Sequence, residues 1–118
     1  MELFEWLTDT RVVRHYQVLA FRQTELSIYY KLEIHITDDT LLYVSEYLDK
    51  HTRTYSFHWQ TSDGTLIRRW DNAPHFKQLA SYPHHVHIGP SNTVIESHDI
   101  GIAEVVQFIL STVLNDPL

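Results

Sequence analysis

Histidine is the residue type in this chain best suited to chemistry near neutral pH, because imidazole can both accept and donate protons there. The chain has 118 residues and nine histidines. Six of them lie in or beside residues 55–88: His51, His58, His75, His84, His85 and His87. Two imidazoles beside an arginine could act as base and acid on a phosphodiester, while the arginine stabilises negative charge. One hypothesis is therefore metal-independent RNA cleavage or another phosphoryl transfer.

A turn within this stretch fixes which residues become neighbours. Asp63-Gly64 is a preferred pair for a two-residue type I′ turn, because both central positions need positive φ. The register that follows places His58 opposite Arg69. Side chains alternate between the two faces of a strand. One face of the hairpin then carries apolar side chains: Phe57, Trp59, Leu66 and Trp70. The other face is polar, and it should bring His58 and Arg69 beside Asp71.

A second group of histidines follows the hairpin and suggests an alternative. The hairpin strand should end near Asp71, because Pro74 lacks the N–H of a central strand. In the next strand His85 and His87 should face outward together. With His75, these residues offer one carboxylate and three imidazoles, a set suited to zinc, nickel or iron. A histidine-rich metal-binding hydrolase is therefore an alternative, although no HExxH or cysteine pair specifies a metal.

Two explanations of the polar face involve no catalysis. Its charged side chains can form an ordinary solvated ion pair, since such pairs across strands are common and contribute little. The same face, or an uncovered strand edge, can instead bind a partner protein through exposed aromatic residues. The sequence is thus compatible with an enzyme, a metal protein or an interaction module.

Composition narrows the class of protein. A formal net charge of −6 argues against broad electrostatic binding to nucleic acid but allows a local basic site. The absence of cysteine excludes disulfides and thiolate chemistry and is typical of cytoplasmic proteins. No apolar run approaches the roughly 20 residues that cross a bilayer. We expect residues 1–118 to form a single cytoplasmic domain that does not span a membrane.

Hydrophobic periodicity predicts the scaffold. Spacing at residues 2–8 indicates a short N-terminal helix, and residues 11–22, 27–36 and 41–48 favour strands. A two-residue turn at Asp38-Asp39 would set Lys31 opposite Glu46. From Asp99 onward one helical stripe is apolar. The sequence therefore predicts an α+β fold, in which an antiparallel meander of five or six strands has its apolar face covered by the C-terminal helix.

Two blocks of the sequence resemble the TumE-type toxin family of bacterial toxin–antitoxin systems. The runs IRRWDNAPH at 67–75 and YPHHVHI at 82–88 are similar to its aromatic-Asp-Asn-Ala-Pro-His-His and Phe-Pro-His-His-x-His blocks. Glu46-Tyr47 matches the upstream Glu-Tyr pair of that pattern. The chain departs from it at Phe76, where the second histidine of the first block would stand, and at Tyr82, which replaces phenylalanine.

The resemblance implies a growth-inhibiting toxin whose partner is a cognate antitoxin protein. With the chemistry above, it implies a ribonuclease acting on RNA without a cofactor, a divalent metal such as zinc being the alternative. Proton transfer would fall to His58 and His85, charge stabilisation to Arg69, orientation of the histidine to Asp71, and support to His87. Glu46 joins this expected site because the resemblance includes it and the register brings it near Lys31. A homodimer and an inactive homologue are also compatible with the sequence.

Overall fold

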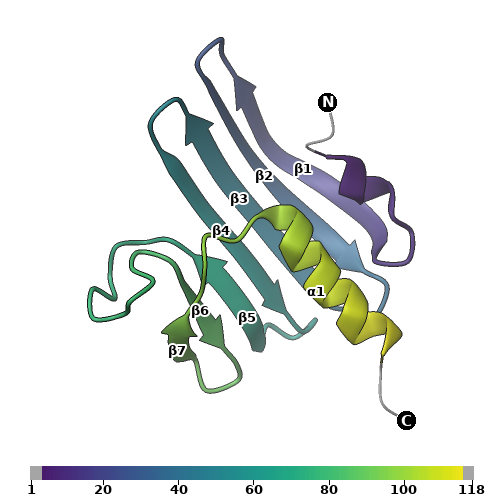
Figure 1. Ribbon diagram of the computed structural model, residues 1–118. Helices are drawn as coiled ribbons and strands as arrows, with labels where there is room; N and C mark the ends of the chain where they lie inside the picture. The colour runs from purple at the N-terminus through teal and green to yellow at the C-terminus, as the bar shows by residue number, and fades with distance from the viewer. Residues whose placement is uncertain (1–3, 116–118) are drawn as a thin grey trace.

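The computed structural model describes residues 4–115 and consists mainly of one antiparallel sheet (Figure 1). Seven strands of the described chain build it: β1 (Val13–Gln23), β2 (Ser27–Ile36), β3 (Leu41–Asp49), β4 (Arg53–Gln60), β5 (Leu66–Asp71), β6 (His85–Ile88) and β7 (Thr93–Glu96). Their order in the sheet is their order in the chain, so the predicted meander is confirmed. The strand count exceeds the expected five or six, and β7, which pairs with β6, lies in a segment that the sequence did not mark as a strand.

Helical structure flanks the sheet in the chain. The helix α1 (Ile102–Leu114) lies across one face of the sheet (Figure 1), as its apolar stripe predicted. The expected N-terminal helix is a single 3₁₀ turn, η1 (Glu5–Thr8), and residues 2 and 3 of that expectation lie outside the described residues. No helix in the described chain has the length and hydrophobicity of a membrane span. The face opposite α1 carries no helix of the described chain (Figure 1), and we call it the open face.

The hydrophobic core lies between α1 and the sheet. Ile34, Leu42 and Phe57 come from three adjacent strands and are completely buried, as is Ile109 of α1. Burying one such side chain contributes about 1.5–3 kcal/mol. The sheet face that contacts α1 therefore provides the hydrophobic core, and the open face can carry polar side chains.

The loop between β2 and β3 is one residue longer than expected. Residues 37–39 form it, with Asp39 at a φ of 72°. The longer loop shifts the pairing of the two strands, so Lys31 faces Ser45 and Tyr30 faces Glu46. The predicted pairing of Lys31 with Glu46 is therefore wrong. Glu46 lies on the core face of the sheet, where it is 5% exposed.

The loop between β4 and β5 is also longer, yet its register agrees with prediction. Gly64 has a φ of 93° whereas Asp63 does not share the positive φ of a type I′ turn, so the predicted two-residue turn is wrong. A bulge at Ile67 absorbs the extra residue. Beyond the bulge His58 faces Arg69, as the sequence predicted. The bulge therefore restores the register on which the open face depends.

Gly89 packs directly against this bulge. Its N–H donates to the Ile67 carbonyl oxygen at 2.8 Å, and a Cβ at Gly89 would lie 1.7 Å from the Leu66 carbonyl oxygen. We predict that Gly89→Ala lowers the free energy of unfolding by about 1–3 kcal/mol, because the backbone must move apart. Urea denaturation should show this as a lower midpoint with an unchanged slope.

Gly101→Ala is the matched control for this change. A Cβ at Gly101 meets no atom within 4 Å, so its cost should be limited to the N-cap preference, about 1 kcal/mol or less. Equal losses in the two variants would show that close backbone approach does not explain the need for glycine at Gly89.

Candidate active site

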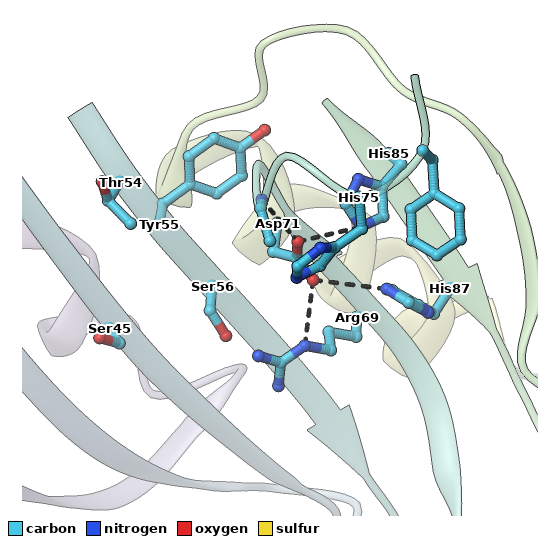
Figure 2. Close-up of a pocket in the computed structure, with 11 residues that line it drawn as sticks. Ser45, Thr54, Tyr55, Ser56, Arg69, Asp71, His75, His85 and His87 are labelled. Carbon is cyan, nitrogen blue, oxygen red and sulfur yellow. Dashed lines mark hydrogen bonds and ion pairs between the residues drawn. The ribbon is translucent and has the colours of Figure 1, made fainter. Parts of the chain in front are cut away.

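Asp71, at the end of β5, is the centre of a polar cluster on the open face (Figure 2). Its Oδ1 accepts a hydrogen bond from the Ala73 N–H and lies 2.9 Å from His85 Nε2. Its Oδ2 accepts from Arg69 Nε at 3.1 Å and lies 3.4 Å from His87 Nε2. Asp71 is 5% exposed. Since a buried carboxylate has lost its hydration, these donors are what make its charge tolerable.

Strand pairing accounts for the arrangement of this cluster. The register of β5 and β6 sets Asp71 opposite His85 and Arg69 opposite His87. Each pair of neighbours is two residues apart on its strand, so all four side chains belong to one face. The prediction that His85 and His87 lie on one side of their strand agrees with this register, which places them beside Arg69 and Asp71.

Asn72 explains why β5 ends where the cluster begins. Its side-chain amide donates to the Arg53 carbonyl oxygen at 2.7 Å, and its Oδ1 accepts from the Tyr55 N–H at 3.0 Å. The amide thus replaces the backbone groups that a further residue of β5 would have presented to β4. The chain can then turn away after Asp71, which leaves the carboxylate at the end of the strand.

His85 lies between two hydrogen-bond acceptors. Its Nδ1 is 2.9 Å from the Pro83 carbonyl oxygen, while its Nε2 faces Asp71. A neutral imidazole has one N–H, whereas the protonated ring has two. The ring of His85 thus reaches one acceptor with each of its two nitrogens. Because the side chain is 1% exposed, this position suits holding Asp71 better than contacting a substrate.

His87 is more accessible than its neighbour. Its side chain is 15% exposed, and its Nδ1 lies 2.7 Å from Asn92 Oδ1. The ring of Phe76 makes edge contacts with His85 and His87, with centroids 4.7 and 5.8 Å away. Phe76, where the family pattern has histidine, therefore forms an apolar wall against both imidazoles. Neither the Phe76 wall nor the Asn92 contact was expected from the sequence, since both residues come from loops.

His58 is connected to Arg69 and not to Asp71. Its Nδ1 lies 3.3 Å from Arg69 Nη1, which has only protons to donate, and its Nε2 is 3.1 Å from Gln60 Oε1. Burial lowers the pKa of His58, and the Arg69 cation and His87 lower it further. His58 therefore lies on the same face as Asp71, as the sequence predicted, but its ring nitrogens contact Arg69 and Gln60 instead of the carboxylate. Arg69 bridges the two residues.

A cavity of about 490 Å³ opens beside the cluster. Arg69, Asp71, His85 and His87 line it together with His75 from the following loop, and Figure 2 shows these side chains gathered around it. Asp71, His85 and His87 can also present one donor atom each within 4.8 Å of one another. This set fits a metal such as zinc. Exposed His75 lines the cavity but is not part of this group of three.

The family model described as Toxin TumE matches residues 3–113. The chain belongs to the TumE toxin family. The resemblance inferred from the two histidine-containing blocks is thereby confirmed. No curated protein and no solved structure matches the chain. In this TumE toxin the two blocks meet in space, because Asp71 comes from the first and the adjacent histidines from the second.

Glu46 lies apart from the Asp71 cluster. It accepts hydrogen bonds from Tyr30 and from Arg53 Nε, and Arg53 continues to Asp99 at 2.5 Å and to the Ile100 carbonyl oxygen at 2.7 Å. This network attaches β3 and β4 to the segment that precedes α1. The structure therefore does not bring Glu46 to the site expected for it, and its contacts stabilise the helical layer instead.

The effect of Arg69 on the pKa of His58 can be measured directly. We predict that NMR titration gives His58 a pKa below its ordinary value of about 6.5. In Arg69→Gln this pKa should rise, because the cation is removed, but it should stay below the ordinary value because burial persists. Arg68→Gln is the control, since Arg68 lies over the Phe108 ring of α1. If neither substitution changes the pKa of His58, Arg69 is not a cause of its lowered value.

Proposed function

We propose that this toxin inhibits growth by cleaving RNA on the open face without a metal. The position of Arg69 carries the proposal, because its guanidinium touches Asp71 through Nε and His58 through Nη1. Arginine suits a phosphate because it is planar and always charged. A phosphate bound at Arg69 would therefore lie between His58 on one side and the histidines of β6 on the other.

His58 suits the role of base in this reaction. Its lowered pKa leaves it uncharged at neutral pH, which is the form that accepts a proton. A phosphate that takes over the Nη donors of Arg69 would release His58 Nδ1 for that purpose. Since the pKa lies below its ordinary value, the base would stay active on the acid side of neutrality and lose activity as pH falls through the lowered pKa.

His87 suits the role of acid, because its side chain is more exposed than that of His85. His58 takes the proton of the ribose 2′-hydroxyl, and the freed oxygen forms a bond to the adjacent phosphorus. The bond from phosphorus to the 5′-oxygen breaks, and His87 donates a proton to that oxygen. The products are a 2′,3′-cyclic phosphate and a 5′-hydroxyl. In this proposal His87 carries out the proton transfer that the sequence analysis expected of His85. Asp71 and His85 position the imidazole of His87.

Membership of a toxin family also supports a protein partner. We propose a cognate antitoxin that blocks access to the Asp71 cluster, since a cell that makes a ribonuclease must restrain it. The open face is accessible to such a partner, because no helix of the described chain covers it (Figure 1). An inhibitor bound there would compete directly with RNA.

The roles of His58 and His87 can be tested in growing cells. We expect expression of the toxin alone to arrest bacterial growth with loss of intact RNA. His58→Ala and His87→Ala, at matched soluble levels, should relieve the arrest. In vitro each should slow cleavage by about 100-fold or more, because each removes one proton-transfer step. An RNA with 2′-deoxy sugars should not be cut, since it lacks the nucleophile.

His51→Ala is the matched histidine control. His51 is exposed in the turn between β3 and β4, so the variant should arrest growth like the wild type. Arrest that persists in the His58 and His87 variants would show that inhibition comes from binding and would remove RNA cleavage as the mechanism. A harmless wild type would indicate an inactive homologue.

A metal-dependent hydrolase is the second candidate, favoured by the grouped donor atoms of Asp71, His85 and His87. A metal held by these residues would supply a Lewis acid or a bound water of lowered pKa. It would also replace the direct contacts that the two imidazoles now make with the carboxylate. The two candidates therefore assign the same histidines incompatible roles.

Metal removal separates the two candidates. Under the favoured proposal, cleavage persists in EDTA, and isothermal titration calorimetry with Zn²⁺ gives no tight binding. Under the alternative, EDTA abolishes cleavage, one metal restores it, and His87→Ala loses Zn²⁺ binding. His98→Ala is the control, because His98 pairs with Glu104 away from the cavity.

A further inference from the structure

A second cavity lies on the open face beside the active-site cavity. Its volume is about 440 Å³, and Lys31, Tyr43, His58 and Leu19 are among the residues that line it. Arg69 lines both cavities, as do two serines of the intervening strands. The two cavities therefore adjoin. Arg69 lies between them, and it is the residue that we propose binds the phosphate.

Strand register explains the shape of this second cavity. Ser45 of β3 faces Lys31 of β2 on one side and Ser56 of β4 on the other. Serine side chains are short, so they form a low floor between Lys31 and Asp71, and Arg69 of the adjacent row also lines the cavity. In the adjacent row Tyr43 faces His58, with ring centroids 6.4 Å apart and planes tilted by 47°. An aromatic wall thus rises beside the floor.

We propose that this second cavity binds the nucleoside adjacent to the cleaved bond of a single-stranded RNA. The inference rests on the proposed function, because Arg69 must hold the phosphate that links the two cavities. The flat ring of Tyr43 and the apolar Leu19 fit the face of a base, and aromatic stacking of this kind tolerates any base. Bases in a duplex are already stacked, so only an unpaired strand can supply one.

The charged residues around the second cavity indicate the direction in which the RNA strand would continue. Lys31 is exposed, and no carboxylate pairs with it within residues 4–115. It is therefore available for the next phosphate of the strand. Glu33, which faces Tyr43 from β2, bonds to His35 at 2.8 Å. Its carboxylate would repel a backbone on that side, which leaves the path toward Lys31.

Binding can be measured separately from cleavage. The probe is a fluorescein-labelled single-stranded RNA with 2′-O-methyl groups throughout, which cannot be cut because no free 2′-hydroxyl is present. We expect Tyr43→Ala and Lys31→Ala to raise the Kd of the full chain at least tenfold by fluorescence anisotropy. Lys31→Ala should also reduce the slope of log Kd against log salt by about 0.7, the value of one phosphate contact on a single strand.

Two controls match these substitutions. Lys50→Ala removes an exposed cation from the turn after β3, and Tyr16→Ala removes an exposed tyrosine from β1, and neither residue lines either cavity. Both controls should keep the Kd within twofold. On a cleavable RNA, Tyr43→Ala and Lys31→Ala should raise KM with little change in kcat, whereas His87→Ala should lower kcat.

The outcomes distinguish the two proposals. If the wild type cleaves RNA while the Tyr43 and Lys31 variants bind and cleave as it does, the subsite is wrong and the ribonuclease stands. If the wild type neither binds the probe nor cleaves RNA, the proposed function fails and the subsite fails with it. Equal weakening by Lys50→Ala would show that the probe senses net charge and would also overturn the subsite.

Discussion

The Asp71 carboxylate is the constraint on which the open face depends. An ion this deeply buried must be paired, and removing one partner of a buried pair costs about 3–5 kcal/mol. Arg69 supplies one donor from the same strand, and His85 and His87 lie within bonding reach from β6. The pairing that satisfies the buried charge therefore also fixes β6 against β5. Because Arg69 binds Asp71 through Nε, its Nη1 points toward His58, and this is where we propose that a phosphate binds.

Side-chain alternation predicted the fold well, while turn chemistry predicted it poorly. Both two-residue turns were wrong, yet the register of β4 and β5 held, because apolar side chains such as Phe57 and Trp70 must face α1 and the bulge adjusts the loop to them. The pairing of β2 with β3 contains no bulge. The extra loop residue therefore shifts their register by one residue from the predicted one. Glu46 shares its parity with buried Leu42 and Val44, so alternation already indicated the core face and the family pattern wrongly outweighed it.

The candidate site was predictable as a set of neighbours but not as a set of bonds. Register specifies which residues lie opposite one another, and it brought Arg69, Asp71 and the histidines of β6 together. It does not specify which atoms meet. Arginine is long enough to reach Asp71 through Nε and His58 through Nη1 at once, so it joins two residues that register alone shows only as neighbours. The burial of His85 depends equally on the loop that carries Phe76, and loop conformation is not readable from strand periodicity.

The proposed RNA substrate requires this acidic protein to confine its attraction for phosphate to one place. The net charge of −6 repels a polyanion over most of the surface, and the affinity that non-specific binding draws from many phosphates is lost. Arg69 and Lys31 both line the cavity above the serine floor, so attraction is restricted to a path across the strands of the open face. Few phosphate contacts mean weak dependence on salt and a larger share for stacking and fit. Under the proposed function, a strand held at so few points would present its phosphate at Arg69, between His58 and His87. This restriction would favour an unpaired segment of RNA.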